Sequence, residues 1–494
     1  MYYVSTRDKT LQYAAAQAIA QGLSRDGGLF TPAVLPRLPA KALEELKDMS
    51  YLQRAVYVMN CFLEDFGITE LTQFADRAYG HGKFDHPDVA PVRQVDDSTW
   101  ALELWHGPTC AFKDMALQML PHLLTASLNK TEEKKNVCIL VATSGDTGKG
   151  ALAGFQDVDR TRILVFYPKD GVSQVQQLQM QTQEGENVGV CAVEGNFDDA
   201  QTGVKRLFSD EGLREELAER GWMLSSANSI NWGRVLPQVV YYVSAYCDLL
   251  RAGAIANGDK VNVCVPTGNF GNILAAFYAK CMGVPFGRLI CASNANNVLT
   301  EFLNTGVYDR NRPFHNTLSP SMDILISSNL ERLLYQLTVG DDAQVRGYME
   351  QLAENGRYQV TDKLKRAIAN HFSAGFCDDE ATKDTIARVW RERHYLLDTH
   401  TAVAFRVLED YRRETGDQTL TIVASTASPF KFSDSVLDAL GQPHGDDGLE
   451  LLDRLSGHTG LPVPEPLAAL RGKPVRFTES TDKGRMADVV RAFV

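Results

Sequence analysis

From about residue 92 to residue 305 the chain repeats one pattern of apolar and polar positions. A short run rich in β-branched residues is followed by a polar or glycine-bearing loop and then by a segment with apolar residues at helical spacing. Strands that alternate with helices in this way are typical of mostly parallel sheets covered on both faces. The predicted strands cover residues 137–141, 163–167, 188–193, 261–265 and 289–292, with a further one at 420–423. We therefore predict an α/β fold, in which ligands bind beyond the carboxyl ends of the strands.

The regions on either side of this repeat have helical spacing without alternating strands. Residues 1–91 predict helices at 11–21, 41–47 and 52–65, and residues 320–395 predict charged amphipathic helices with no strands between them. We expect four regions: an N-terminal mainly helical domain at 1–91, a catalytic α/β region at 92–319, a helical insertion at 320–395, and a return to the catalytic domain with a C-terminal tail rich in proline and glycine at 396–494.

The composition narrows the class of protein. The 494 residues are 44% hydrophobic and 23% charged, as in ordinary globular enzymes, and the net charge of −12 argues against nucleic acid or an anionic membrane surface as partner. The nine cysteines form no CxxC pair and no metal-like spacing, so we expect free thiols and no metal site. The N-terminus has no signal-like layout and no apolar run approaches about 20 residues, so we expect a cytoplasmic protein.

Lys113 occupies a position that predicts unusual chemistry. Gly107-Pro108 indicates a tight turn after the apolar run 100–105, and Asp114 then begins a helical segment. Lys113 therefore lies at a strand–loop–helix junction with apolar neighbours, where burial lowers the pKa of an ammonium group toward the neutral amine. A neutral amine is what Schiff-base formation with a carbonyl requires. The stretch alone leaves a solvated lysine at a helix start as the alternative.

Two loops that follow predicted strands have the features of anion sites. In residues 142–150, hydroxyl groups and backbone N–H groups precede a helix, but two residues instead of four separate Gly145 from Gly148, so the loop is not of the Walker type. A plain turn between strand and helix is the alternative there. In residues 266–272, two glycines three positions apart allow the backbone to approach an anion closely at a helix N-terminus.

The sequence HGPTCAFKDMALQ at residues 106–118 closely resembles the pyridoxal phosphate (PLP) lysine segment of the threonine synthase family, HGPT-x-AFKD-x-ALQ. Residues 24–32 resemble that family's DGGLF-x-P segment, and GNFGN resembles its loop for the PLP phosphate. The resemblance implies the type II fold of PLP enzymes, like that of the tryptophan synthase β subunit, with PLP bound covalently to Lys113. It also implies that the PLP phosphate is held by Gly268, Asn269, Phe270, Gly271 and Asn272.

The same resemblance implies further roles. The substrate α-carboxylate is assigned to a loop containing Thr143, Ser144, Asp146 and Thr147, and the pyridine nitrogen of PLP to Thr426. Arg234 is a candidate ligand of the substrate phosphate, and the alternative is an arginine on a solvated helix start. His400 lies in another family-like string, where a structural hydrogen bonder is the simpler interpretation. The chain departs from the family's STAHPAKF string, because Ser428 and Phe430 replace histidine and alanine.

The activity implied by the resemblance is conversion of O-phospho-L-homoserine and water to L-threonine and phosphate, with Lys113 as general base and acid. One alternative is a related PLP-dependent lyase that yields 2-oxobutyrate, ammonia and phosphate. An alternative of another class is a catalytically silent regulator that binds an anionic metabolite. The expected partner is a small-molecule substrate, without nucleic acid or membrane, and the chain is expected to be a monomer or a homodimer.

Overall fold

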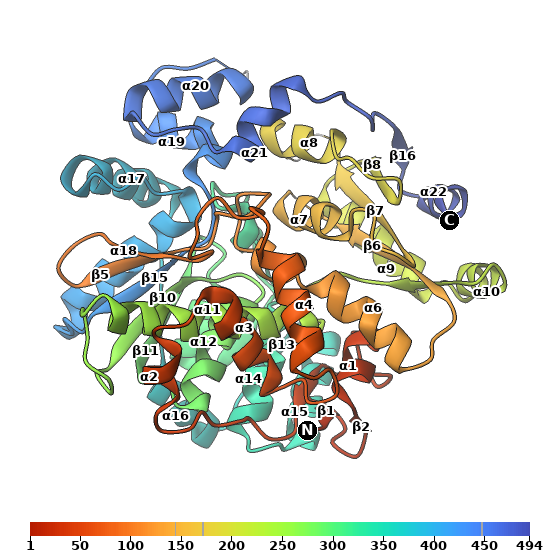
Figure 1. The fold of residues 1–494 in the computed structure, drawn as a ribbon, viewed down its shortest axis with the longest axis horizontal. Coiled ribbons are helices and arrows are strands. Elements are labelled where there is room, and N and C mark those ends of the chain that lie inside the picture. Colours follow the sequence, from red (N-terminus) through yellow and green to blue (C-terminus); the bar gives the residue numbers. More distant parts are fainter. Residues whose placement is uncertain (144, 170–171, 446–447) are drawn as a thin grey trace.

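A computed structural model of the protein describes residues 1–143, 145–169, 172–445 and 448–494. Two mostly parallel sheets lie side by side, with β6, β7 and β8 on the right and β5, β10 and β15 on the left in Figure 1. The larger sheet has the order β14-β11-β10-β15-β5-β4, in which only β4 and β5 pair antiparallel. Its strands are β4 (Val92–Gln94), β5 (Thr99–Glu103), β10 (Val261–Pro266), β11 (Phe286–Ser293), β14 (Phe372–Phe376) and β15 (Thr421–Ser425).

The smaller sheet has the order β16-β8-β7-β6-β9, and every neighbouring pair in it is parallel. Its strands are β6 (Asn136–Ala142), β7 (Thr161–Pro168), β8 (Val188–Glu194), β9 (Trp222–Ser225) and β16 (Ser480–Asp482). The helices around it include α6 (Leu120–Lys130), α7 (Asp146–Phe155), α8 (Gln174–Gln181), α9 (Phe197–Ser209), α10 (Glu211–Glu219) and α22 (Met486–Phe493). The α/β fold with mostly parallel sheets is confirmed, and all six predicted strands are present, three in each sheet.

The central strands β10 and β15 of the larger sheet are buried along their whole length because both faces of the sheet are covered there. All six residues of β10 are buried, which is typical of a parallel strand between two layers of helices. The helix α11 (Trp232–Arg251) is buried from Trp232 to Leu249 and packs against α12 (Gly271–Met282), α3 (Tyr51–Asn60), α5 (Asp114–Leu117) and α6. A helix that is apolar on all sides belongs in the core, so α11 forms the centre of the molecule rather than one of its surfaces.

The N-terminal region is helical, as predicted, but it also contains a small sheet. Its helices are α1 (Ala15–Gln21), α2 (Ala42–Leu46), α3 (Tyr51–Asn60) and α4 (Ile68–Tyr79), of which α4 was not predicted. The strands β1 (Tyr3–Ser5), β2 (Gln12–Tyr13) and β3 (Phe30–Pro32) pair antiparallel in the order β2-β1-β3. Strands of two or three residues are too short to produce a period-2 pattern, which is why the sequence did not reveal them.

The region at 320–395 contains four α-helices: α14 (Leu330–Leu337), α15 (Asp342–Asn355), α16 (Asp362–His371) and α17 (Asp379–Arg393). The prediction that no strands separate them is wrong. The strand β13 (Arg357–Gln359) pairs with β12 (Val307–Asp309), and β14 extends the larger sheet beside β11. Before α14, the short helices α13 (Val298–Thr305) and η1 (Pro320–Met322) lead the chain past the carboxyl ends of β10 and β11.

The last hundred residues return to both sheets. After α18 (Thr399–Thr415) and β15 come η2 (Pro429–Phe432), α19 (Ser433–Ala439), α20 (Gly448–Thr459), α21 (Glu465–Ala468) and η3 (Ala469–Gly472). The part predicted as a tail is therefore structured, and its end adds β16 to the smaller sheet beside β8. All nine cysteines are unpaired. Within the described ranges, no helix has the length and apolar character needed to cross a membrane.

Candidate active site

Lys113 lies between β5 and the short helix α5 (Asp114–Leu117), at the junction that the sequence predicts. The turn before it is closed by the buried carboxylate of Asp114, which accepts hydrogen bonds from the backbone N–H of Thr109 at 2.8 Å and from its hydroxyl at 2.7 Å. The amine of Lys113 donates to Oγ of Ser321 at 3.2 Å. Desolvation lowers the pKa of Lys113 to about 8, and the positive charges of Lys431 and Arg234 act in the same direction, whereas Asp146 opposes them.

The loop after β15 pairs directly with the segment that carries Lys113. The backbone N–H of Phe112 donates to the carbonyl of Thr426 at 2.8 Å, and that of Ser428 donates to the carbonyl of Cys110 at 3.0 Å. Thr426 therefore lies beside the lysine, and its hydroxyl makes no hydrogen bond to any described residue. Ser428 is completely buried, and its hydroxyl accepts from the N–H of Phe430 at the start of η2. The residue that replaces the family's histidine is thus a helix cap.

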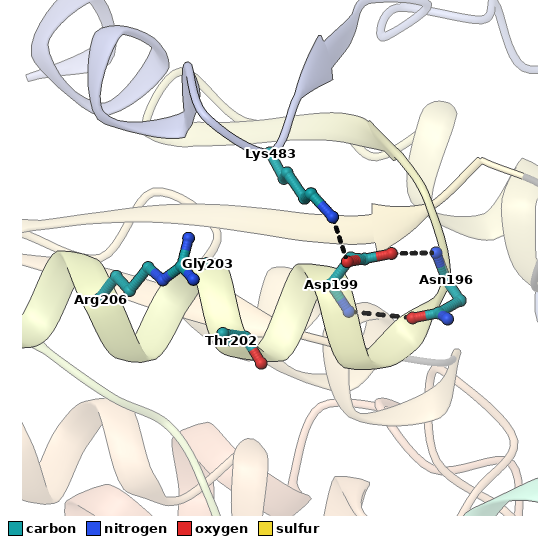
Figure 2. Close-up of a pocket in the computed structure, with 6 residues that line it drawn as sticks. All are labelled: Asn196, Asp199, Thr202, Gly203, Arg206 and Lys483. Carbon is teal, nitrogen blue, oxygen red and sulfur yellow. Dashed lines mark hydrogen bonds and ion pairs between the residues drawn. The ribbon is translucent and has the colours of Figure 1, made fainter.

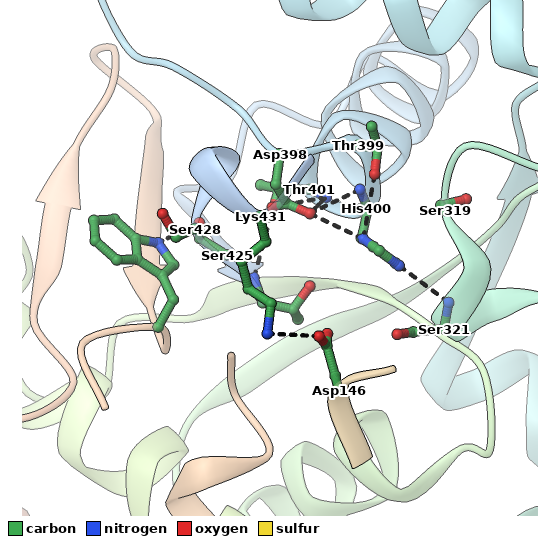
Figure 3. Close-up of polar contacts among 12 residues, drawn as sticks. Asp146, Ser319, Ser321, Asp398, Thr399, His400, Thr401, Ser425, Ser428 and Lys431 are labelled. Carbon is green, nitrogen blue, oxygen red and sulfur yellow. Dashed lines mark hydrogen bonds and ion pairs between the residues drawn. The ribbon is translucent and has the colours of Figure 1, made fainter. Parts of the chain in front are cut away.

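A buried ion pair joins the two sheets next to Lys113. The ammonium group of Lys431, on η2, lies 2.6 Å from the carboxylate of Asp146, the first residue of α7, and the two side chains are 0% and 3% exposed (Figure 3). Lys431 also donates to the carbonyl of Thr109 at 2.8 Å, and Gln176 donates to Asp146 at 3.1 Å. Burial raises the pKa of Asp146, but Lys431 and Lys113 outweigh it and hold this pKa well below its usual range.

The loop before α7 is shaped by the hydroxyl of Thr143. This hydroxyl accepts from the N–H groups of Gly145 and Gly148, both at 3.0 Å, and donates to the carbonyl of Gly145. Gly145 has φ of +143° and a Cβ there would meet the Gln176 amide, so the turn requires glycine. Thr147 lies in the first turn of α7. Ser144 lies outside the described residues.

The GNFGN loop connects β10 to α12, and the segment around η1 holds it. Gly268 fits against the carbonyl of Ser321 so closely that a Cβ would lie 2.5 Å from its oxygen. The carbonyl of Gly268 accepts from Oγ of Ser327 at 2.7 Å, and that of Asn269 accepts from the Asn329 side chain at 3.0 Å. Phe270 has φ of +63°, a left-handed conformation that costs about 1 kcal/mol or more in a residue with a side chain and is typical of ligand sites.

Two buried nitrogen atoms near this loop have no hydrogen-bond partner among the described residues. Asn272, in the first turn of α12, accepts from the hydroxyls of Tyr241 and Tyr242 but leaves its own Nδ2 unpaired. Arg234, in the first turn of α11, donates from Nη1 to the carbonyl of Ala227 and leaves Nε unpaired. Arg234 is 3% exposed, so the alternative of an arginine on a solvated helix start is wrong. Burial lowers its pKa to about 10.

Ser321 is the residue that sequence reasoning missed. It lies in η1, at the start of the region predicted as an insertion, and no motif distinguishes its string Ser-Pro-Ser-Met. Its backbone N–H donates to Nε2 of His400 at 3.2 Å, and Nδ1 of His400 lies 3.0 Å from the carboxylate of Asp398 (Figure 3). Asp398 is also the N-cap of α18, so His400 lies in the first turn of that helix. His400 is thus a structural hydrogen bonder, as the simpler interpretation held.

Two hollows lie away from these residues. A small one of about 170 Å³ is lined by Asn196, Asp199 and Lys483, whose side chains already pair with one another or with the backbone (Figure 2). A larger one of about 820 Å³ lies between α4, α6 and α7. None of the candidate residues lines either hollow. Within the part of the chain that is described, no group of three histidine, cysteine, aspartate or glutamate residues could hold a metal ion.

Three family models match the chain in succession. Residues 2–79 match "Threonine synthase N terminus", residues 88–361 match "Pyridoxal-phosphate dependent enzyme", and residues 401–494 match "Threonine synthase, C-terminal". The chain is 39% identical to the threonine synthase of Pseudomonas aeruginosa over 444 residues, which is 90% of this chain and 91% of that protein. It is 41% identical to threonine synthase-like 1 of Homo sapiens over 435 residues, which is 86% of this chain but only 58% of the human protein.

Solved structures agree over the whole chain. The PLP-bound threonine synthase of Brucella melitensis is 37% identical, covers 100% of this chain and 99% of its own, and superimposes with a TM-score of 0.88. The yeast threonine synthase is 32% identical, with coverage of 100% and 98% and a TM-score of 0.89. The predicted type II PLP fold is thereby confirmed. On all of these grounds, the chain belongs to the threonine synthase family of PLP-dependent enzymes.

Proposed function

We propose that the protein is a threonine synthase that converts O-phospho-L-homoserine and water to L-threonine and phosphate. Two neighbouring groups carry this proposal. One is the Lys113 amine, whose pKa is lowered, and the other is the buried, incompletely paired guanidinium of Arg234, whose positive charge contributes to that lowering. The first group suits proton transfer at carbon, and the second suits a phosphate leaving group. The similarity to the Pseudomonas aeruginosa enzyme over nearly the full length of both chains supports the same conclusion.

The residues around Lys113 fit PLP. The half-buried amine of Lys113, with its lowered pKa, is available for the cofactor's aldehyde, and the N-terminus of α12 presents aligned N–H groups to a phosphate. The unpaired Nδ2 of Asn272 adds a donor that would otherwise cost free energy. Thr426 offers a hydroxyl beside Lys113 for the pyridine nitrogen. When bound, PLP supplies an electron sink for negative charge at the carbon next to the substrate's amino group.

Lys113 is the proposed proton carrier. A pKa of about 8 keeps both the amine and the ammonium populated near neutral pH, so one group can accept a proton from Cα and later return one. The overall reaction removes protons from Cα and Cβ, expels phosphate from Cγ, adds the hydroxyl group of water at Cβ, and returns protons to Cγ, Cα and the phosphate.

The substrate's two anionic groups are assigned to different elements. Arg234 binds the phosphate of O-phosphohomoserine with the Nε–H that has no partner among the described residues. The α-carboxylate binds at the loop before α7, where Thr147 and backbone N–H groups are the donors. Ser144, assigned to the same loop from the sequence, is a further donor. Thr143 supports this loop from beneath, because its hydroxyl is already bonded to Gly145 and Gly148. Asp146 contributes through its ion pair with Lys431.

Product analysis tests the proposal. The purified protein with PLP is incubated with O-phospho-L-homoserine, and phosphate, threonine and 2-oxobutyrate are quantified by NMR, with Lys113→Ala as the control. We expect threonine and phosphate in equal amounts, and none from the control. Phosphate accompanied by equal amounts of 2-oxobutyrate and ammonia would instead identify the related lyase, which shares every step up to water addition. Absence of phosphate release would favour a silent binder of anionic metabolites.

A further inference from the structure

A continuous series of hydrogen bonds leads from a buried carboxylate to the amine of Lys113. Asp398 contacts Nδ1 of His400 at 3.0 Å, Nε2 of His400 accepts from the N–H of Ser321 at 3.2 Å, and Oγ of Ser321 accepts from Lys113 at 3.2 Å. Asp398 and His400 are 1% and 3% exposed. Figure 3 shows His400 between Asp398 and Ser321.

These hydrogen bonds indicate which ring nitrogen of His400 carries the proton. A backbone N–H can only donate, so Nε2 of His400 is an acceptor and carries no proton. The ring proton is therefore on Nδ1, where it faces the carboxylate of Asp398. In this tautomer the ring reaches Lys113 only through Ser321, so His400 fixes the position of Ser321 rather than carrying protons to the lysine.

Ser321 is held on its other sides as well. A Cβ on residue 268 would lie only 2.5 Å from the carbonyl oxygen of Ser321, so only glycine at position 268 allows the two backbones to pack this closely. The turn of η1 is closed by hydrogen bonds from the N–H of Met322 to the carbonyl of Ser319 at 2.9 Å and from that of Asp323 to Pro320 at 3.1 Å. The backbone of Ser321 is thus held by its hydrogen bond to His400 and by close packing against Gly268, inside a turn closed by two further hydrogen bonds, and its hydroxyl accepts from Lys113.

We propose that Ser321 holds the amine of Lys113 in its working position, and that His400 and Asp398 are positioning residues that fix Ser321. A lysine side chain has four flexible carbons, and a proton carrier that rotates away from the reacting carbon loses the advantage of proximity. The hydroxyl accepts from either the amine or the ammonium, because both retain an N–H. This inference rests on the proposed function in one respect, that the reaction uses the amine of Lys113.

The first test measures Lys113 itself in Ser321→Ala. The full chain without cofactor is reductively methylated with ¹³C-formaldehyde, and the pKa of Lys113 is read from the pH dependence of its ¹³C signal. The charged groups that face it (Asp146 on α7, Lys431 on η2 and Arg234 on α11) are the same in both proteins. Loss of a hydrogen bond that favours the ammonium should lower this pKa by a further 0.5 to 1, approximately.

The second test measures turnover in the PLP-loaded enzyme. We expect kcat of Ser321→Ala to fall about tenfold while KM changes less than twofold, since the hydroxyl orients the amine and does not bind substrate. A lower pKa by itself increases the fraction of neutral amine, so a decrease in rate would come from lost orientation. Ser321→Thr, which keeps the hydroxyl, should restore both values, and Ser319→Ala, which removes a nearby hydroxyl bonded to Asn294, should change neither.

His400 variants separate positioning from proton transfer. His400→Gln keeps an acceptor for the N–H of Ser321, whereas His400→Ala removes it, so the glutamine variant should retain most of the rate that the alanine variant loses. Equal losses in the two variants would overturn the positioning role, and so would an unchanged pKa and kcat in Ser321→Ala. Circular dichroism verifies the fold of each variant. If wild type produces no threonine but Ser321→Ala still shifts the pKa, the proposed function fails and the Ser321 contact stands.

Discussion

Replacing Lys431 with methionine removes one half of the ion pair that joins the two sheets beside Lys113. Methionine has nearly the shape of the lysine stem, so packing changes little, but the carboxylate of Asp146 remains buried at 3% exposure with the Gln176 amide as its remaining side-chain donor. An uncompensated buried charge is among the few changes that cost several kcal/mol. Lys431→Met therefore tests whether this pair stabilises the junction between the sheets.

The magnitude follows from the geometry. At 2.6 Å and an effective dielectric constant of about 20, the attraction between the two charges is about 6 kcal/mol. Part of this offsets the cost of desolvating both groups, and removal of one partner from buried pairs typically costs about 3–5 kcal/mol. Asp146→Asn with Lys431→Met removes both charges and keeps an acceptor for Gln176, so the double variant should recover at least half of the loss.

The loss should also depend on pH. The pKa of Asp146 is held below its usual value in the folded protein, so its contribution to stability is present above the pKa of the unfolded carboxyl group and disappears as the pH falls through the folded value. Without Lys431 the folded pKa rises, and protonation at lower pH removes the unpaired charge. The difference between wild type and Lys431→Met should therefore be larger at pH 8 than at pH 5.

Urea unfolding measures these differences. Fluorescence and circular dichroism transitions must coincide for the free energies to be valid, and the cofactor is removed from all proteins because a ligand that binds the folded state adds to its stability. Lys483→Met is the matched control, since Lys483 pairs with Asp199 at 2.8 Å on the surface and should have no measurable effect. A loss below about 1 kcal/mol at pH 8, or a double variant that is less stable than Lys431→Met, would refute the reasoning.

Three other substitutions test the cofactor contacts. Gly268→Ala places a Cβ 2.5 Å from the carbonyl oxygen of Ser321, so we expect lower stability together with weaker PLP retention, measured by urea unfolding and by absorbance after gel filtration. A Cβ at residue 271 meets only ordinary contacts, the nearest at 3.4 Å, so the backbone tolerates a side chain there. We expect Gly271→Asp to keep the fold but lose PLP, because it adds a negative charge beside the cofactor phosphate; normal PLP occupancy would exclude the loop from the site. Thr426→Val should weaken PLP binding by about 1 kcal/mol and alter its absorbance spectrum, and an unchanged spectrum and affinity would show that Thr426 does not contact the ring.

The strongly periodic parts of the fold could be predicted from the sequence. All six predicted strands are four to six residues of nearly continuous β-branched or apolar character, which burial on both faces of a parallel sheet requires. Their division between two sheets could not be predicted, because pairing depends on contacts between residues far apart in the chain, such as β16 with β8. Short strands such as β1 and β13 carry no period and are determined by their neighbours.

The candidate site divides in a similar way. Lys113, the GNFGN loop and Thr426 lie in strings with recognisable spacing, and the structure brings Lys113 together with Thr426 through paired backbones and with Gly268 through Ser321. Ser321 itself could not be found, because its role depends on a single hydroxyl and on a backbone contact with His400 across 79 residues. The role of Thr143 could not be predicted either, because a threonine that shapes a loop and a threonine that binds a ligand look the same in the sequence.

The most direct test of the account is to identify the lysine that carries the cofactor. The PLP-loaded protein is reduced with borohydride, digested, and analysed by mass spectrometry for the peptide that retains the pyridoxyl group. We predict a single modified site at Lys113, which is half-buried and whose pKa desolvation lowers to about 8. Modification at Lys149, a half-buried lysine whose pKa desolvation lowers to about 7, or at any other lysine would contradict the account.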